Sequence, residues 1–298
     1  MGYSIGSWNL RTFTGNEEKR DIDMIANIIF SENFHIVALQ EIMSTKNIMG
    51  SQVLESLKKR LPGWDGSIGN FYSRRYGFNV EDYGFGFLWN SRFFQKAPDE
   101  GRITDFERFG SVGQISRDPV YMRFIPKNGP FIEIRLINVH IEYRSNSAQD
   151  KQKRIEEFKH ITGQIHNSIN THRYGNFRPA YTIVMGDYNL TAVICQINEG
   201  KDSVFYAQTK QGDETTISKN GYANDYDHFS YNEERFAGIH IKMQRIDSVR
   251  KYMNNDFEKH KKMLSDHVPI KLEFELNTRK SSVYAGIYSE DSTNKSEE

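Results

Sequence analysis

The sequence predicts an α/β protein in which helices cover β-sheets. Short runs of β-branched and aromatic residues alternate along the chain with longer runs of helical character. In the longest helical run, apolar residues recur every three or four positions, which is typical of a helix with one buried face. Alternation of the two kinds of segment favours a fold whose helices pack on the faces of sheets.

Eight segments are predicted to be strands: residues 3–8, 35–39, 83–89, 120–125, 131–139, 181–185, 244–249 and 268–276. The last contains KLEFEL, whose strict alternation indicates one buried and one wet face. Helices are predicted over residues 17–31, 46–61 and 147–170. The apolar stripe of the third helix consists of Ile155, Phe158, Ile161, Ile165 and Ile169.

The domain organisation is expected to be simple. The chain has 298 residues, 37% of them hydrophobic, which is enough for one domain with a large core. We assign residues 1–276 to that domain. Residues 277–298 are rich in Ser, Asn, Lys and Glu, so we expect a polar tail that is partly disordered.

Composition narrows the setting of the protein. Lys+Arg and Asp+Glu both number 39, so net charge predicts no general attraction to nucleic acid, and any basic surface must be local. The single cysteine, Cys195, cannot form an intrachain disulfide, and it is interpreted as a buried residue. The sequence has neither an apolar run near the about 20 residues of a membrane span nor a signal peptide at its start. We therefore expect a cytoplasmic protein.

Polar residues recur where predicted strands end. Asn9, Glu41 and His140 each follow a strand, as do Asp187 and Asn189 after YTIVMG. Two further sites belong to the same pattern, with Asp266 and His267 immediately before the final strand and Asp247 inside the run RIDSV. Taken singly, an Asp at a strand end usually caps a turn, and a lone His is more often structural.

A shared cation would explain these acids together. An ionised carboxylate at the margin of an apolar strand is costly unless something neutralises it. Carboxylate and amide oxygens are hard ligands that suit Mg²⁺, Mn²⁺ or Ca²⁺. The pattern therefore predicts a metal site, with Mg²⁺ as the first choice of cofactor.

The motifs also occur in a recognisable order. The set WN, LQE, SRDP, NVH, GDYN, RIDSV and SDHVP resembles the endonuclease/exonuclease/phosphatase family, in the branch of deoxyribonuclease I. MGDYN together with the later SDH is the most specific pair. The resemblance implies a four-layer α/β sandwich, with two mixed sheets packed face to face and helices outside. It also implies a metal-dependent phosphodiester hydrolase, most simply a DNA endonuclease.

The resemblance assigns roles to the strand-end residues. It makes Glu41 the principal metal ligand, with Asn9 beside it and Asp266 in support. It places Asp187 and Asn189 at the phosphate, the attacking water or a second metal. His140 and His267 would flank the scissile phosphate, and Asp247 would orient His267. A histidine at His140 is typical of the deoxyribonuclease I branch and not of abasic-site repair nucleases.

Two departures from the family pattern affect these roles. The family pattern requires an acid that orients His140 on the strand YGFGFLW, and here Glu81 and Asp82 both precede that run. We prefer Glu81 for this role. The alternative that Glu81 is only an exposed acid of a loop is equally open. The pattern also requires a basic residue two positions after Glu41, and this chain has Met43. Either one contact to DNA phosphate is lost or Lys46 replaces it.

Several basic residues are predicted to bind the substrate. Arg117, in SRDP, matches a phosphate-contacting arginine of the family. Arg144 follows the strand of His140 and could touch backbone phosphate. The loop NFYSRRYGF offers Arg74 and Arg75 among aromatic residues for phosphates and bases, or it is a solvated turn. The segment YDHFSYNEERF, with Asp227 and His228, is interpreted as structural support, and His228 is not expected to be catalytic.

Three functions stay open at this point. The first is a metal-dependent nuclease acting on DNA. The second is a phosphoesterase on a phospholipid or inositol phosphate. The third is a non-catalytic nucleic-acid-binding module, which the presence of every principal site residue disfavours. Because free DNase activity in a cytoplasm would be harmful, we also expect a restraint, such as an inhibitory or targeting partner. The oligomeric state does not follow from the sequence.

Overall fold

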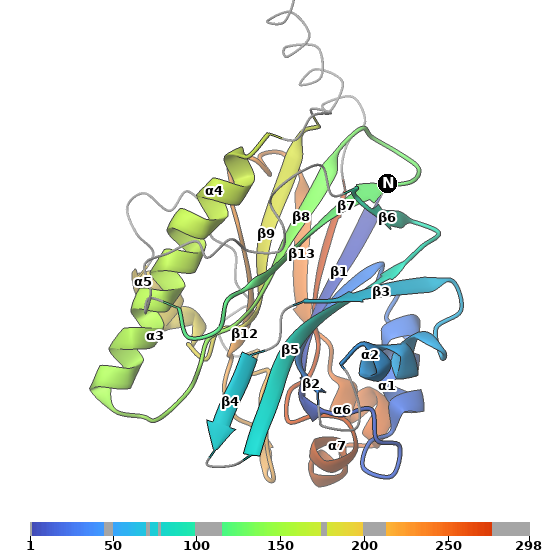
Figure 1. Ribbon diagram of the computed structural model, residues 1–298, viewed down its shortest axis with the longest axis vertical. Helices are drawn as coiled ribbons and strands as arrows, with labels where there is room; N and C mark the ends of the chain where they lie inside the picture. The colour runs from blue at the N-terminus through green and yellow to red at the C-terminus, as the bar shows by residue number, and fades with distance from the viewer. Residues whose placement is uncertain are drawn as a thin grey trace, which may run out of the picture.

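A computed structural model describes residues 2–44, 50–69, 72–76, 79–98, 115–173, 178–198 and 213–275; for residues 72–76 and 79–83 it describes the backbone alone. The predicted boundary at residue 276 and the tail lie outside the described residues and stay predictions. The described chain forms two mixed β-sheets with helices on their outer faces (Figure 1).

The larger sheet, sheet A, has seven strands. Its order is β13 (His240–Arg245), β14 (Ile270–Glu275), β1 (Gly2–Phe13), β2 (Ile36–Ser44), β5 (Asn79–Asn90) and β3 (Trp64–Ile68), and β4 (Tyr72–Tyr76) also pairs with β5. The pair β1–β2 is parallel and the other pairs are antiparallel. The residues that end β1 and β2 therefore lie at the same edge as the residues that precede β14.

The second sheet, sheet B, has five strands. Its order is β12 (Asp227–Tyr231), β9 (Ala180–Asp187), β8 (Glu133–His140), β7 (Val120–Pro126) and β6 (Phe94–Lys96). The pair β8–β9 is parallel, and β12 runs antiparallel to β9. A separate two-stranded ribbon is formed by β10 (Ile217–Ser218) and β11 (Gly221–Tyr222).

The main core lies between the two sheets. It combines interior side chains of sheet A, such as Ile5 and Phe87, with those of sheet B, such as Phe124, Leu136 and Ile183. Two further apolar clusters lie between each sheet and its helices. The predicted four-layer sandwich is thus confirmed, because each sheet buries one face on the other sheet and one face under helices.

The helices divide between the two outer faces (Figure 1). The side of sheet A carries α1 (Ile22–Ser31), α2 (Gly50–Lys58), α6 (Ser248–Met253) and α7 (Phe257–Met263). The side of sheet B carries α3 (Ala148–His160), the π-helical segment η1 (Ile161–Ile165), α4 (His166–Thr171) and α5 (Ala192–Asn198). The predicted helix 147–170 is therefore one rod with a π-helical segment, and its apolar stripe is buried as expected. Cys195 is also buried.

At two predicted boundaries an aspartate N-cap sets a helix start that the sequence pattern did not predict. The first helix begins at Ile22, because the side chain of Asp21 accepts the Met24 amide as an N-cap, and residues 17–19 form a turn. The strand predicted over 244–249 ends at Arg245, and a helix begins at Ser248. Asp247 caps that helix, since its side chain accepts the amide of Arg250.

Gly186 allows the parallel strands β8 and β9 to approach each other just before the ends of these strands at His140 and Asp187. Its φ is +145°, and a Cβ atom there would lie 2.0 Å from the Val139 carbonyl oxygen. We expect Gly186→Ala to reduce the free energy of unfolding by at least about 3 kcal/mol, measured by denaturant titration. Gly163→Ala is the matched control, because no atom lies within 4 Å of its added Cβ. A loss below about 1 kcal/mol at Gly186 would contradict this strain.

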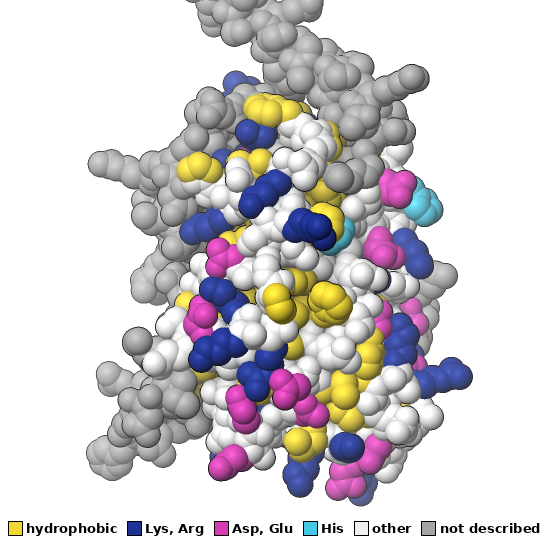
Figure 2. Space-filling model, turned by 90° about the vertical axis from the view of Figure 1, so that its right-hand side faces the viewer, with side chains coloured by type: hydrophobic (Ala, Val, Ile, Leu, Met, Phe, Trp, Pro, Cys, Tyr) yellow, Lys and Arg dark blue, Asp and Glu magenta, His cyan; other side chains and the backbone are white. Residues whose placement is uncertain are grey.

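The surface agrees with the balanced composition. On the face shown in Figure 2, Lys and Arg side chains lie interspersed with Asp and Glu side chains. Within the described residues, the helices are too short or too polar to cross a membrane.

Candidate active site

The interior rows of four strands lead to polar residues at one end of the sandwich. In β1 the row Tyr3, Ile5 and Ser7 continues to Asn9, and in β8 the row Ile134, Leu136 and Asn138 continues to His140. The row of β9 ends at Asp187, and the row of β12 starts at Asp227. Since alternate residues of a strand share a face, these four side chains point between the sheets. All are buried, with exposed fractions from 1% to 7%.

Glu41 reaches the same place through a β-bulge. Between Leu39 and Ile42 the register of β2 against β5 shifts by one residue, and Glu41 has a φ of +58°. Regular alternation would turn Glu41 toward the outer helices, whereas the extra residue turns it into the site. Its carboxylate accepts the amide of Thr12 at 2.8 Å and the carboxamide of Asn9 at 3.2 Å.

Asp187 lies at the centre of the cluster. Its Oδ2 atom accepts the Asn9 carboxamide at 3.0 Å and lies 3.5 Å from Nε2 of His140 and 3.6 Å from Nε2 of His267. The Nε2 atom of His140 also lies 3.9 Å from Oε1 of Glu41. Two imidazoles and two carboxylates from both sheets thus converge on one point.

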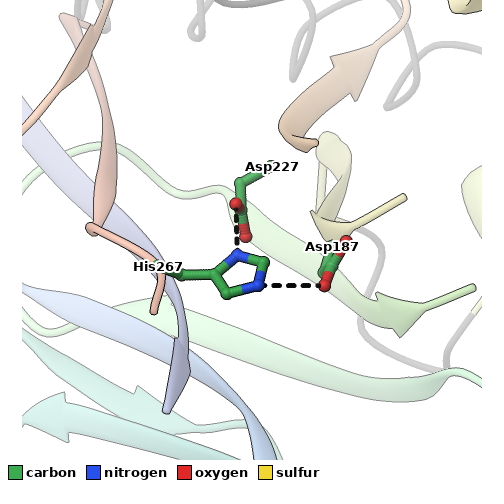
Figure 3. Close-up of side chains that lie close together, drawn as sticks. All are labelled: Asp187, Asp227 and His267. Atoms are coloured by element: carbon green, nitrogen blue, oxygen red, sulfur yellow. Dashed lines mark hydrogen bonds and ion pairs between the residues drawn. The ribbon is translucent and has the colours of Figure 1, made fainter. Parts of the chain in front are cut away.

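His267 is oriented by Asp227, and the predicted role of Asp247 was wrong. The Nδ1 atom of His267 lies 2.8 Å from Oδ2 of Asp227, and its Nε2 faces Asp187 (Figure 3). Asp227 is itself fixed by the hydroxyl of Thr215 at 2.6 Å. Asp247 instead accepts the Tyr222 hydroxyl and caps α6. Asp227 thus supports the site by positioning the imidazole, and this specific contact was not predicted from the sequence.

Burial and neighbouring charges shift the pKa values of both Asp187 and His267. Burial raises the pKa of the Asp187 carboxyl, against the opposing effect of the His267 charge. Burial disfavours the charge of His267, but the carboxylates of Asp227 and Asp187 outweigh it and raise the pKa of the imidazole. The pair therefore favours the charged form of the His267 imidazole and disfavours the charged form of the Asp187 carboxyl.

Two partly buried acids, Glu41 and Asp266, offer the oxygen ligands that a hard divalent cation prefers. Glu41 and Asp266 are only partly buried, with side-chain exposures of 16% and 26%. Asn9 fits less directly, because its nitrogen faces the carboxylates while its oxygen accepts the Arg11 amide at 2.8 Å. The carboxamide would have to turn before it could bind metal. Asp187, Asp227 and His267 also place one atom each within 4.8 Å of one another, but Nδ1 of His267 is already hydrogen-bonded to Oδ2 of Asp227.

A buried polar network lies directly beneath the site. The Gln40 carboxamide donates to Oδ1 of Asn138 at 2.7 Å and to the Ser7 hydroxyl at 3.1 Å. Asn138 donates in turn to the backbone carbonyls of Leu39 and Gly86. These contacts explain the Gln of LQE and the Asn of NVH. They also fix sheet A to sheet B next to the candidate site residues.

Several motif residues support the site from their loops. The Trp8 indole donates to the carbonyl of His267 at 2.9 Å, which accounts for the Trp of WN. The Asn189 amide donates to Asp187, and the Asn189 carboxamide donates to the carbonyl of Ile141. The side-chain nitrogen of Asn189 therefore holds the segment after β8 in place. His228 is fully buried against the carbonyl of Leu190, in agreement with the structural role expected for it.

The predicted substrate-binding residues are only partly described. Arg144 is 60% exposed, pairs with Glu142 at 2.7 Å, and lines a pocket of about 670 Å³ beside the end of β8. Arg117 is partly buried in the loop before β7. Met43 is buried, so it contributes packing at the position where the family pattern has a basic residue. Four residues have side chains outside the described set: Lys46, Arg74, Arg75 and Glu81.

Comparisons with known proteins agree with this architecture. No sequence family and no curated protein matches the chain. Among solved structures, an endonuclease/exonuclease/phosphatase protein from Bacteroides vulgatus superposes with a TM-score of 0.61 at 14% identity, over 93% of this chain and 100% of that one. D. rerio TDP2 with a single-strand DNA product gives 0.60 at 16% identity, over 92% and 99%. The mannosyl-6-phosphatase of Bacteroides thetaiotaomicron gives 0.57 at 15% identity, over 92% and 100%. The chain therefore has the fold of the endonuclease/exonuclease/phosphatase proteins.

Proposed function

We propose that this protein is a metal-dependent phosphodiester hydrolase that cleaves DNA. The observation that carries the proposal is the position of Asp187, whose Oδ2 lies within 3.6 Å of Nε2 atoms from two histidines. Glu41 and Asp187 accept from the same carboxamide nitrogen of Asn9. Carboxylates between two imidazoles form a site that can accept a proton on one side of a phosphate and supply one on the other.

The roles of the chain's own residues follow from their partners. Asp187 accepts a proton of the attacking water, because its raised pKa makes the carboxylate a stronger base than an exposed one. His267, cationic and held by Asp227, donates through Nε2 to a phosphate oxygen, where negative charge grows during attack. His140 approaches Asp187 from the neighbouring strand and donates to the opposite side of the phosphate.

A divalent cation completes this arrangement. Glu41 and Asp266 would hold it, and Asn9 would join them if its carboxamide turned. When bound, the cation would draw charge from the phosphate oxygens and stabilise the leaving alkoxide. Mg²⁺ is the expected ion, since it often uses only one or two protein carboxylates together with substrate oxygens.

DNA is favoured over the other substrates by the diester chemistry that two histidines can serve. The likeness in fold to a TDP2 solved with a DNA product supports this choice. The likeness to a mannosyl-6-phosphatase makes a sugar phosphomonoester the main competitor. A phospholipid or inositol phosphate remains the third candidate, carried over from the family resemblance.

The purified protein should cleave DNA in Mg²⁺ and lose at least about 10³-fold of that rate when a chelator is added. Supercoiled plasmid, single-stranded DNA and an abasic duplex would be assayed beside mannose 6-phosphate, an inositol phosphate and phospholipid vesicles. Mn²⁺ and Ca²⁺ would be tested in parallel. Nicked and linear plasmid on a gel, and released phosphate for the other substrates, are the readouts.

The outcomes separate the candidates. Phosphate release from mannose 6-phosphate with intact plasmid would replace the nuclease proposal by a phosphomonoesterase. Hydrolysis of vesicles or inositol phosphate alone would select the third candidate. DNA binding without hydrolysis of any substrate in any of the three metals would indicate a binding module. Cleavage that survives both the chelator and the His267→Ala change would indicate a contaminating nuclease.

A further inference from the structure

An ion pair at the rim of the site involves one of the two predicted metal ligands. The Nε atom of Arg11 lies 3.2 Å from Oδ2 of Asp266. Both side chains are partly exposed, at 43% and 26%. Among the described residues, Arg11 is the arginine that forms an ion pair with a proposed metal ligand, Asp266.

The backbone around Arg11 is strained in a way that makes this pair possible. Arg11 and Thr12 have φ values of +46° and +47°, which residues with a Cβ rarely adopt. They are the extra residues of a bulge, since Asn9 pairs with Gln40 and Phe13 with Ile42 across β1 and β2. Such strain persists only where the surroundings enforce it, and it is concentrated at functional sites.

Surrounding contacts fix the bulge from both sides. The Arg11 amide donates to Asn9 Oδ1 at 2.8 Å, and the Arg11 carbonyl accepts the guanidinium of Arg20. Arg20 also donates to the carbonyl of Leu264 at 2.8 Å, two residues before Asp266. The loop of Arg11 and the loop of Asp266 are thus tied together by a third side chain.

One short bulge therefore contacts both carboxylates on the open side of the site. The amide of Thr12 binds Oε2 of Glu41 at 2.8 Å, and the guanidinium of Arg11 binds Asp266. The two contacts differ in kind. A backbone amide positions a carboxylate without neutralising it, whereas a guanidinium supplies a full positive charge of the sign that the cation would supply.

We infer that Arg11 is a built-in counter-ion of Asp266 that competes with the divalent cation for this carboxylate. The inference rests on the proposed function, because it takes Glu41 and Asp266 as metal ligands. In the metal-free protein the pair limits repulsion among the acids. When a divalent cation binds, its double charge displaces the guanidinium, whose partial exposure leaves it free to turn toward solvent. Arg11 thereby lowers the affinity of the site for metal.

Removing this competitor should tighten metal binding. We expect Arg11→Gln to lower the Kd for Mn²⁺ about two- to fivefold, the range that an exposed ion pair supports. Arg11→Lys keeps the charge without the planar guanidinium, so its Kd should lie between those of the wild type and Arg11→Gln. Binding would be measured on the purified full chain at low ionic strength, from the electron paramagnetic resonance signal of free Mn²⁺.

Controls separate pairing from a general change of charge. Arg60→Gln removes a partly exposed arginine that pairs with Glu17 at 2.9 Å on α1's side of the protein, and it should leave the Kd unchanged. Asp266→Asn alone should weaken Mn²⁺ binding. Adding Arg11→Gln to Asp266→Asn should have no further effect, because the carboxylate for which Arg11 competes has been removed. Thermal unfolding of each metal-free variant checks that it is folded.

Each outcome decides one question. If Arg11→Gln leaves the Kd unchanged or weakens binding while Asp266→Asn weakens it, the counter-ion role is wrong and the proposed metal site stands. If Arg11→Gln tightens binding equally in the Asp266→Asn background, the effect is one of overall charge, and the pairing role is again wrong. If Asp266→Asn has no effect on Mn²⁺ binding, the metal assignment itself fails. Should Arg11→Gln not fold, Arg11→Lys supplies a weaker test, in which a Kd no lower than that of the wild type would contradict the counter-ion role.

Discussion

Replacing His267 by alanine should lower the turnover of the proposed hydrolase by about 10²–10⁴-fold, and His140→Ala should have an effect of the same order. The reason is the common target of the two imidazoles, since both Nε2 atoms face Oδ2 of Asp187, one from the end of β8 and the other from the segment before β14. Steady-state rates on the substrate identified in the metal-dependent assay would measure both losses. The double variant should lose less than the product of the single losses, because residues that act as a unit are not additive.

His240→Ala is the matched control for these changes. His240 is exposed and lies on β13 opposite Glu275, at the end of sheet A remote from Asn9 and Asp266. Its removal should leave kcat within about twofold, as expected for a surface change away from the site. Near-wild-type turnover in the double variant His140→Ala with His267→Ala would remove both imidazoles from the mechanism. Circular dichroism and thermal unfolding would verify that each variant is folded.

Asp227→Asn should be nearly as damaging as loss of His267, by about 10²–10⁴-fold in kcat. In this variant an amide replaces the carboxylate that accepts the Nδ1 proton of His267. An amide can hold the imidazole in the wrong tautomer, and it carries no negative charge to stabilise the imidazolium. KM should change little, because Asp227 acts through His267 and is almost completely buried. Steady-state kinetics on the same substrate would resolve the two constants.

Asp247→Asn provides the direct comparison, since the sequence alone had favoured Asp247 for this task. Asparagine is as good a helix N-cap as aspartate, so the start of α6 should be preserved. We expect kcat within about threefold of the wild type and a change in stability within about 1 kcal/mol. A loss at Asp247 equal to that at Asp227 would show that the orienting role is assigned to the wrong carboxylate.

Much of the site could be predicted because alternation along a strand is a local property. Apolar rows such as Ile134 and Leu136 continue to Asn138 and His140 with the period of a strand. The parallel pairs then bring the ends of these rows to one edge without any further information. The confirmed sandwich follows from the same pattern, combined with helices that have one apolar face.

Asp227 was missed although the sequence contained a signal for it. In the strand DHFSY, Asp227 lies on the same face as Phe229 and Tyr231, and both of these lie in the core between the sheets. A strand that begins with an interior acid has to neutralise it, and His267 is the neighbour that does so. The antiparallel pairing of β12 with β9 places Asp227 opposite Asp187, and that pairing is not visible in the local sequence.

Two other features depended on tertiary structure. RIDSV has the composition of a strand, but the chain turns at Asp247 and begins a helix. The bulge that turns Glu41 inward requires a positive φ at a residue with no preference for it, so local propensity argues against it. Both cases show tertiary contacts overriding local preference at the edge where the polar residues gather.

The hydrogen bond between Gln40 and Asn138 has a consequence for how such a protein can change over time. Both sheets supply residues of the candidate site, and this amide pair joins the two sheets beside it. Apolar neighbours in the interior can exchange methyl groups with one another and still fill the same volume. Replacement of either amide would leave a buried polar atom unsatisfied and allow the layers to slip relative to each other. Drift in the interior is therefore constrained most tightly at two side chains that never touch a substrate.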